Sequence, residues 1–549
     1  MNFIKVKLSA KMLALILFIF LSFDAACQNN DLNIWRNIIY HVENGIELKL
    51  NLFIPKISQD NNQLVILLHG ERMQNKEDFE CLAINLAKLG TNVATIDYRI
   101  PPDYSYPKAI NDVLTAIEWI RKNSQSYSLS FTTIGLAGQN FGGYIATLTG
   151  IKYPDTIHGI AAIHAPMNLT NYNPPPSGYS YRYQAFVGFP LAQNPERWQE
   201  VSPFYQVNEK SPPILLLHGV SDEYVPFSQS EEMEKEINSQ NGLVWLYSSE
   251  KAGNGSFIKS EMCENTAKIL ARFYNFSLSS LSKVEIEKNL IYANINERNL
   301  HMDIIKPQNV DGKLPVVIFI HGGGWVWGNK KDMWEEAAEL ASKGFITATV
   351  EYRLARERIY PAAVDDLKAA VRWLRSNANK YDIQSNKIGV VGRSAGGHLA
   401  SLLGVTSEKK YFGELIGPSD PSAEIQSVVT MSGVVDMTGL YPRDPFAPSV
   451  FLGYSLIEAP ELYQKASPVN HVGNKSAPFL FIHGTKDHLG SHDEVINMAN
   501  KLQSFGITGE VHSIENGGHD FEKNPKWRVE AMNAMVDFFE KTLKNEIQK

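Results

Sequence analysis

Three residues in the second half of the sequence could together cleave an ester or amide bond. Ser394 lies in GRSAGG (392–397), between an apolar stretch and a helical pattern. Asp487 follows the apolar stretch FLFIHG, and His519 lies in GGHDF before the last helical pattern. A serine hydroxyl attacks a carbonyl carbon when a neighbouring base removes its proton, and a carboxylate holds that base in the productive tautomer. We therefore predict Ser394 as nucleophile, His519 as base and Asp487 as acid.

A glycine-rich stretch upstream could supply the rest of such a site. HGGGW (321–325) follows the apolar run PVVIFI, and a glycine run there frees backbone N–H groups from strand pairing. Such groups bind the oxyanion that forms during attack, and losing one donor costs about 10²–10³ in rate. We expect the N–H groups of Gly323, Gly324 and Ala395 to form this oxyanion hole. The alternative is a tight turn that is merely rich in glycine.

The elements that position these residues occur twice in the chain. IIYHVENGIELKLNLFIP (38–55) corresponds to LIYANINERNLHMDIIKP (290–307), and later motifs of the two halves are 254 and then 265 residues apart. A chain of 549 residues is too long for one ordinary core, so we predict a tandem duplication with two domains. Their predicted bounds are 28–275 and 284–549, joined by the serine-rich linker 276–283.

Each half alternates short apolar runs with helical patterns. In the second half PVVIFI, FITATV and KIGVVG have no polar alternation, and amphipathic helical patterns separate them. Strands of this kind are typical of a parallel sheet that is covered on both faces. The predicted fold class is therefore α/β, with two tandem domains, each a mostly parallel sheet between helices.

The motifs of the second half resemble those of the α/β-hydrolase esterases. HGGGW, EYRLA, GRSAGGHLASLLG, HGTKD and GGHDF are similar to motifs of the hormone-sensitive-lipase-like and carbohydrate-esterase branches, and the likeness covers nearly all of 284–549. The resemblance implies a serine esterase that needs no metal or organic cofactor. It also implies short-chain or aromatic acyl esters as substrates, with acetyl or feruloyl groups on plant polysaccharide as in acetyl-xylan and feruloyl esterases.

Other functions compete with this interpretation. A serine peptidase of the prolyl-oligopeptidase type and an arylformamidase share the fold, but the peptidase usually carries a β-propeller, and the chain has no blade-length repeats. A non-catalytic tandem that binds polysaccharide is a third alternative, and the complete serine, acid and histidine set of the second half counts against it. The net charge of −7 and the scattered lysines exclude a nucleic-acid-binding protein.

The first half keeps the pattern but has lost the chemistry. Asn140, in GQNFGG, stands at the nucleophile position, and Asp222 stands at the acid position. Pairing GNGSF with GGHDF puts Gly255 at the position of the catalytic histidine. An amide nitrogen is not a nucleophile, and no base remains. We predict a degenerate, catalytically inactive domain.

Two further features of the first half agree with this prediction. Glu71 and Arg72 replace two glycines of the oxyanion loop, and a carboxylate there would oppose the developing negative charge. A nucleophile turn requires φ > 0, which asparagine tolerates better than most residues. Asn140 therefore fits a turn that survives without its reaction.

The N-terminus predicts export. MLALILFIFLSF (12–23) follows three lysines and precedes AAC, as in a signal peptide spanning 1–27, and its twelve apolar residues are short for a membrane span of about 20. We expect a periplasmic, cell-surface or secreted protein. Cys27 resembles the acylated cysteine of bacterial lipoproteins, whereas cleavage before Gln28 would remove it, so a lipid anchor stays open. The sequence also leaves open whether Cys81 and Cys263 pair.

Aromatic residues gather in two predicted cap regions. NYNPPPSGYSYRY (171–183) offers either a sugar-stacking surface or a loop packed by its own rings. The stretch 406–466 of the second half is expected to shape the substrate pockets or to form the core of a cap. Its aromatic residues are Tyr411, Phe412, Tyr441, Phe446, Phe451 and Tyr454.

Overall fold

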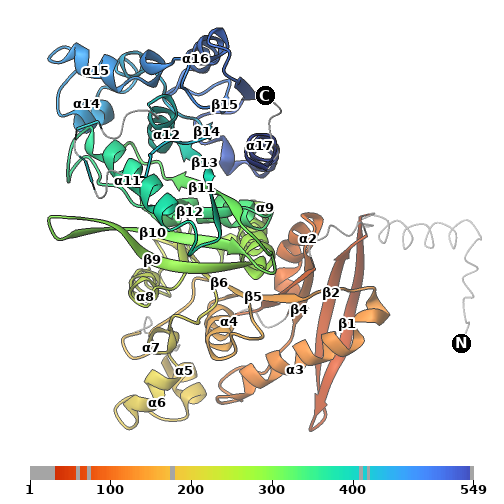
Figure 1. Ribbon diagram of the computed structural model, residues 1–549. Coiled ribbons are helices and arrows are strands. Elements are labelled where there is room, and N and C mark those ends of the chain that lie inside the picture. The colour runs from red at the N-terminus through yellow and green to blue at the C-terminus, as the bar shows by residue number, and fades with distance from the viewer. Residues whose placement is uncertain are drawn as a thin grey trace, which may run out of the picture. The chain divides into compact units, whose positions relative to one another are not determined.

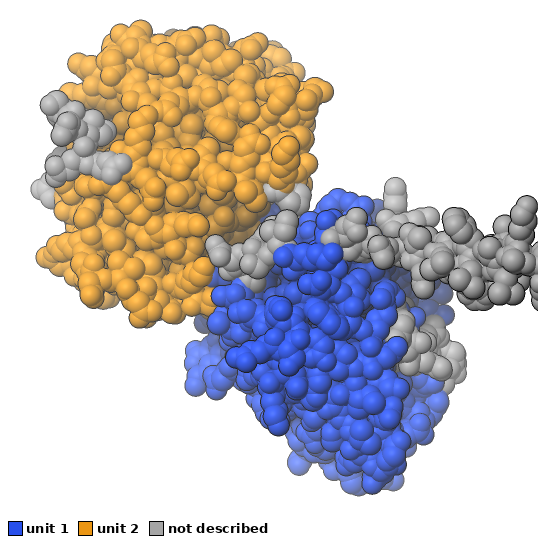
Figure 2. All heavy atoms as spheres, turned by 90° about the vertical axis from the view of Figure 1, so that its right-hand side faces the viewer, with its two compact units in different colours: residues 1–279 blue, residues 280–549 orange. Residues whose placement is uncertain are grey.

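The computed structural model divides into two compact units, residues 1–279 and 280–549 (Figures 1 and 2). The residues it describes are 31–56, 62–70, 76–172, 180–250, 252–406, 412–413, 415–416 and 421–544. The predicted signal peptide and Cys27 lie outside them. No helix in the described part of the chain combines the length and the apolar character that crossing a membrane requires.

The first unit is built on one eight-stranded sheet with the order β1-β2-β4-β3-β5-β6-β7-β8. The first two strands pair antiparallel, β2 also pairs antiparallel with β4, and all later pairs are parallel. The central strands are buried throughout their length, which is why they lack polar alternation. The strands are β1 (Leu32–Glu43), β2 (Ile46–Pro55), β3 (Gln63–Leu68), β4 (Asn92–Ile96), β5 (Thr133–Gln139), β6 (Gly159–Ile163), β7 (Ile214–Gly219) and β8 (Val244–Ser249).

Helices cover both faces of this sheet. Leu64 and Ile66 of β3 share one core with α3, α4 and α8, whereas Val65 between them shares the other core with α2 and α9. Since alternate residues of a strand point to opposite faces, the two cores lie on opposite sides of the sheet. The helices are α2 (Glu80–Lys88), α3 (Lys108–Asn123), α4 (Phe141–Lys152), α5 (Ser180–Val187), α6 (Pro195–Glu200), α7 (Pro203–Gln206), α8 (Ser228–Ser239) and α9 (Ser260–Tyr274).

A disulfide joins the two helices on one face of the first unit. Cys81 of α2 and Cys263 of α9 are bonded, with Cα atoms 6.4 Å apart and a sequence separation of 182. The pairing that the sequence left open is therefore present in the structure, and it closes most of the first unit into one covalent loop.

The predicted linker 276–283 contains the boundary between the units, but its first part differs from a loop. The chain continues from α9 as a π-helical turn, η5 (Asn275–Ser280), followed by a 3₁₀ turn, η6 (Leu281–Lys283). Phe276 and Leu278 are buried against the first unit, where Phe276 packs edge-on to Trp245. This packing was not predicted, because a serine-rich stretch is typical of a linker exposed to solvent.

The second unit repeats the architecture of the first. Its sheet has the order β16-β15-β14-β13-β11-β12-β10-β9, which is the order of the first sheet read from the other edge. The predicted fold class is therefore confirmed in both halves. The strands are β9 (Val284–Ile295), β10 (Arg298–Pro307), β11 (Leu314–Ile320), β12 (Ile346–Val350), β13 (Ile383–Arg393), β14 (Ser427–Met431), β15 (Phe479–Gly484) and β16 (Gly509–Ile514).

The second sheet is likewise covered on both faces. Helices α11, α12 and α16 form one core with it. On the other side, the Thr347 hydroxyl of β12 donates to the Ala337 carbonyl of α10 (3.0 Å), and Phe539 of α17 lies against Gly389 of β13. The helices are α10 (Trp334–Ala341), α11 (Ala362–Ser376), α12 (Ala395–Val405), α13 (Met437–Leu440), α14 (Phe446–Leu452), α15 (Pro460–Ala466), α16 (His492–Ser504) and α17 (Pro525–Phe539).

Candidate active site

Ser394 occupies a strained turn between β13 and α12. Its backbone has φ 53° and ψ −119°, a conformation that few residues other than glycine adopt. The flanking glycines allow the strand and the helix to approach, because a Cβ at Gly392 would lie 2.0 Å from the Gly396 carbonyl oxygen. A Cβ at Gly396 would in turn lie 2.2 Å from the Ile320 carbonyl oxygen at the end of β11. This geometry is that of a nucleophile elbow.

The structure brings the three predicted residues of the second half together. His519 Nε2 lies 2.8 Å from the Ser394 Oγ, and His519 Nδ1 lies 2.9 Å from the Asp487 Oδ2. The carboxylate is buried, and the imidazole is 12 % exposed. A hydrogen-bonded chain of this form allows the imidazole to take the serine proton.

The protein environment keeps Asp487 ionised. Burial, the largest single effect, favours the protonated carboxyl, but hydrogen bonds from His483 and His519 outweigh it and hold the pKa of Asp487 well below its usual range. The backbone N–H groups of Leu489 and Gly490 also donate to Oδ1, at 2.9 and 3.1 Å. The acid is thereby fixed in place and remains negatively charged at neutral pH.

The pKa of His519 is raised above its ordinary value. Burial favours the neutral ring, but the hydrogen bond and the charge of Asp487, with further contributions from Asp520 and Glu522, outweigh it. The base must be neutral to accept the serine proton, so activity is lost as the pH falls through this raised pKa.

We predict that the acid limb of a kcat/KM–pH profile lies above pH 6.5, the ordinary pKa of histidine. Asp520→Asn removes one of the charges that stabilise the imidazolium, so its limb should move to lower pH by a fraction of a unit. Hydrolysis of an aryl acetate between pH 5 and 9 measures both. A limb that stays in place in the variant would contradict this account of the His519 pKa.

The glycine-rich loop after β11 begins beside the nucleophile, since a Cβ at Gly322 would lie 3.2 Å from the Ser394 Cβ. Gly323 and Gly324 have φ of 108° and 57°, and a Cβ at Gly323 would lie 2.3 Å from the Trp327 carbonyl oxygen. Ala395 is the first residue of α12, where backbone N–H groups have no partner within the helix and the helix dipole favours negative charge. These positions suit the predicted oxyanion hole.

Trp325 anchors this loop to the nucleophile helix. Its indole N–H donates to His398 Nδ1 (3.2 Å), and its ring stacks on Phe451 at 4.8 Å. The other ring nitrogen of His398 donates to the Ala466 carbonyl (2.8 Å), and burial lowers the pKa of His398 to about 4. His398 is therefore neutral, with one nitrogen for each partner, and Phe451 is core rather than pocket wall.

The first unit preserves the elbow without the nucleophile. Asn140 has φ 51° and ψ −119°, within a few degrees of the serine in the second unit. Its side-chain amide exchanges two hydrogen bonds with Asn254, at 2.9 and 3.1 Å, and the Asn254 amide also donates to the Asp222 Oδ2 at 3.0 Å. An Asn–Asn–Asp chain thus replaces Ser–His–Asp, and neither amide can act as nucleophile or base.

The predicted counterpart of the catalytic histidine requires correction. Asn254, and not Gly255, lies between Asn140 and Asp222. Matching Phe257 to Phe521 departs by one residue from the constant offset of 265 that holds from β8 to α9. The 3₁₀ turns η4 (Ser256–Ile258) and η9 (Phe521–Lys523) keep that offset, as do the strands and helices on either side of them. Holding the offset fixed would have identified the asparagine from sequence.

Aromatic rings pack beside the elbow of the first unit, and the first of them stands where the second unit has a small residue. Phe141 stands where the second unit has Ala395, and its ring lies 5.2 Å from Phe186 and 5.9 Å from Tyr183. All three rings are buried, and Asn140 is only 6 % exposed. Within the described part of the 171–183 stretch, Tyr183 packs inward, as in the second of the two alternatives, whereas Tyr181 is 51% exposed.

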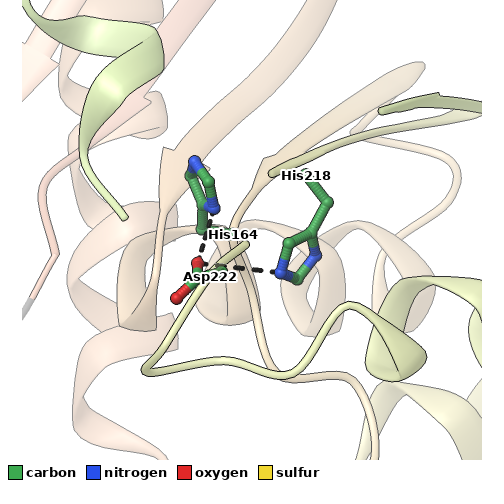
Figure 3. Close-up of side chains that lie close together, drawn as sticks. All are labelled: His164, His218 and Asp222. Atoms are coloured by element: carbon green, nitrogen blue, oxygen red, sulfur yellow. Dashed lines mark ion pairs between the residues drawn. The ribbon is translucent and has the colours of Figure 1, made fainter. Parts of the chain in front are cut away.

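Figure 3 shows a buried cluster around the acid of the first unit. Asp222 Oδ2 lies 2.6 Å from His164 Nδ1 and 3.7 Å from His218 Nε2. His164 directly follows β6, at the position that Ser432 occupies after β14 in the second unit. Because the counterpart is a serine, the comparison of the two halves gave no reason to expect a histidine near the acid. Burial is the largest single effect and raises the pKa of Asp222. The interactions with His164 and with backbone N–H groups together outweigh it, so the pKa of Asp222 is lowered.

The three side chains have metal-ligand atoms within 4.8 Å of one another, and His218 is hydrogen-bonded through both of its ring nitrogens. His218 Nε2 donates to the Val225 carbonyl (2.9 Å), and its counterpart His483 donates to the Gly490 carbonyl (2.8 Å). A nitrogen that carries this proton is not available as a metal ligand. The cluster instead supplies donors to a buried carboxylate.

The predicted Glu71 and Arg72 replacements lie outside the described residues.

The BD-FAE family model matches residues 50–237 and 302–502, one segment in each unit. Together the two segments cover more than half of the sequence. The chain belongs to the BD-FAE family. The repeated BD-FAE match agrees with the two sheets of identical order and with a duplication of one ancestral domain.

Individual relatives of this BD-FAE chain include named esterases. Esterase LipC of Mycobacterium tuberculosis is 31% identical over 217 residues, which is 38% of this chain and 53% of that protein. Esterase LipQ of the same organism is 28% identical over 218 residues, 38% of this chain and 51% of that protein. The chain thus spans about half the length of these curated relatives. A solved structure described as a truncated form of a carbohydrate esterase from gut microbiota is 29% identical, with a TM-score of 0.44 over 48% of this chain and 97% of that one.

Proposed function

We propose that the second unit is a serine ester hydrolase and that the first unit is catalytically inactive. The hydrogen-bonded chain from Ser394 through His519 to Asp487, on a nucleophile elbow, is the observation that carries the proposal. Relatives described as esterases support an ester rather than an amide as the bond that is cleaved.

Acylation follows from the geometry of the site. Ser394 Oγ attacks the ester carbonyl carbon while His519 Nε2 takes its proton, and the oxyanion accepts hydrogen bonds from the N–H groups of Gly323, Gly324 and Ala395. The bond to the alcohol oxygen then breaks, and His519 returns the proton to the departing alcohol. The acyl group is left on Ser394.

Deacylation uses the same groups in reverse. His519 takes a proton from water, whose oxygen attacks the acyl carbon, and the oxyanion hole again holds the negative charge. The carboxylic acid leaves as the proton returns to Ser394 Oγ. The residues of the site perform both halves of this reaction, and no step in it calls for a metal or an organic cofactor.

For the substrate we propose an acylated carbohydrate, with an acetyl or feruloyl group on plant polysaccharide. Membership of the BD-FAE family and the resemblance of the motifs to carbohydrate esterases support this class. A small ester with a good leaving group would also react, because the triad itself does not select the alcohol.

For the location we propose export, to the periplasm, the cell surface or the medium. The signal-peptide pattern at 1–27 supports it, and so does the disulfide between Cys81 and Cys263, since structural disulfides persist in oxidising compartments. Cys27 would either carry a lipid anchor or be removed, and mass spectrometry of the mature N-terminus distinguishes the two.

A substrate panel tests the proposed reaction. The purified protein is incubated with acetylated xylan, feruloylated arabinoxylan oligosaccharides, an aryl acetate, a peptide p-nitroanilide and N-formylkynurenine. We expect release of acetate or ferulate and no cleavage of the two amides. Faster cleavage of either amide would favour a peptidase or an arylformamidase, and turnover of the aryl acetate alone would contradict the carbohydrate part of the proposal.

A further inference from the structure

The oxyanion loop carries an exposed tryptophan that the reaction itself does not use. The Trp327 backbone N–H donates to the Gly323 carbonyl (3.0 Å), so the indole is one hydrogen-bonded turn from the proposed oxyanion hole. Trp327 is 60% exposed, whereas Trp325 in the same loop is buried. Single exposed apolar side chains are common, so the place of this ring, next to the proposed oxyanion hole, is what makes it a candidate contact for a substrate.

Trp327 is held in place from one side. The guanidinium carbon of Arg356 lies 4.0 Å from the centre of the indole, close enough for a cation–π contact. The next residue, Gly328, has φ 101°, and a Cβ there would lie 2.5 Å from His321 Nδ1. The ring is therefore fixed before any ligand arrives, with one face on the cation and the rest of its surface available.

A second exposed ring lies on the other flank of the oxyanion glycines. Phe446 is 67% exposed at the start of α14, and the Asp444 carboxylate accepts from its backbone N–H at 3.0 Å. The following residue, Ala447, has its Cβ 3.6 Å from where a Cβ at Gly324 would stand. The Phe446 backbone is thus held next to the residue that contacts Gly324, and Trp327 lies one turn from Gly323.

We propose that Trp327 and Phe446 form a stacking platform for a pyranose ring in the alcohol part of the ester, a role that rests on the proposed function. When the ester carbonyl oxygen lies at Gly323 and Gly324, the acyl and alcohol parts extend from the carbonyl carbon in different directions. The two exposed rings would contact the alcohol part, which is the part that remains in solvent. The C–H face of a pyranose packs on the electron-rich face of an indole while its hydroxyl groups stay hydrated.

The sequence of the first half differs at one of the two rings. The corresponding stretch, ERMQN (71–75), contains no aromatic residue. The first half therefore lacks a counterpart of Trp327, although it keeps an exposed ring, Tyr181, at the position of Phe446.

Binding and turnover of Trp327→Ala test the platform. Remote binding energy is expressed only with substrates that reach it, so we expect kcat/KM for an acetylated xylooligosaccharide to fall about tenfold and that for p-nitrophenyl acetate to change less than about twofold. Trp327→Phe should restore most of the loss. Phe505→Ala removes another exposed ring, 47% exposed at the end of α16, and should change neither value.

A binding measurement separates this inference from the proposed reaction. Titration of unacylated xylohexaose into Ser394→Ala should give heat, and the same titration into Ser394→Ala/Trp327→Ala should show affinity about tenfold weaker. The platform is refuted, while the reaction stands, if the wild type deacetylates the oligosaccharide and Trp327→Ala has the same kcat/KM. The same conclusion follows if Trp327→Ala lowers kcat/KM equally for the oligosaccharide ester and for p-nitrophenyl acetate. If the wild type releases no acetate yet xylohexaose binding depends on Trp327, the reaction is refuted and the platform stands.

Discussion

Replacing Ser394 with alanine is expected to lower kcat for an acyl ester by about 10⁶, the loss typical when a serine nucleophile is removed. The alanine leaves His519 and Asp487 in place but gives the imidazole no hydroxyl to deprotonate. Hydrolysis through water alone, aided by the oxyanion donors, would account for the residual rate. Release of acetate from acetylated xylan and from an aryl acetate measures the effect on both kinds of substrate.

Asn140→Ala is the matched control because the two positions have the same backbone geometry. It removes the amide at the elbow of the first unit and should leave both rates within about twofold of the wild type, the range expected where no transition-state contact is lost. Circular dichroism of both variants confirms that they fold. If Asn140→Ala abolished turnover, or if Ser394→Ala retained it, the assignment of one active and one inactive unit would be wrong.

The geometry of the candidate site in the second unit could be predicted from sequence because its motifs report backbone conformation as well as residue type. GRSAGG requires glycines wherever a Cβ would meet the facing backbone, and the structure has such close approaches at Gly392 and Gly396. The acid follows β15 and the base follows β16, both at the carboxyl edge of the sheet, where parallel strands bring their ends together. Residue type, order and position therefore all agree.

The site of the first unit could be predicted only in part. Asn254 was not predicted because the alignment of Phe257 with Phe521 shifts the two halves by one residue from their constant offset of 265. His164 had no signal, since it comes to the acid from the end of a neighbouring strand and its counterpart is a serine. Pairing of Cys81 with Cys263 was undecidable because the spacing of two cysteines says nothing about which helices face each other. These features depend on packing between distant segments.

The losses in the first unit follow a physical logic. A buried carboxylate that loses its histidine would be left with too few donors, which is costly in a low-dielectric interior. Asp222 keeps the two backbone N–H donors, Tyr224 and Val225, and gains the Asn254 amide and His164 in place of a catalytic base. The acid is thus retained as a hydrogen-bonded part of the core although no histidine connects it to the elbow residue, and the sheet edge keeps its geometry.

Removing the disulfide should destabilise the first unit by up to about 5 kcal/mol, the chain-entropy value for closing a loop of this length. The bond between Cys81 and Cys263 spans 182 residues and holds α2 against α9. Cys81→Ser/Cys263→Ser frees the unfolded chain of the first unit and leaves the second unit unchanged in sequence. Each unit has its own core, so denaturant unfolding should show two transitions, of which only one moves to lower denaturant.

The second unit supplies the internal control for this experiment. Ester hydrolysis reports the folding of its site, because Ser394, Asp487 and His519 come from segments far apart in sequence. Activity should therefore survive in denaturant that already unfolds the first unit of the double variant, and a reducing agent should reproduce the effect in the wild type. Loss of activity together with the weaker transition would contradict independent folding of the two units. An unchanged transition would show that packing of α2 on α9 alone stabilises the first unit.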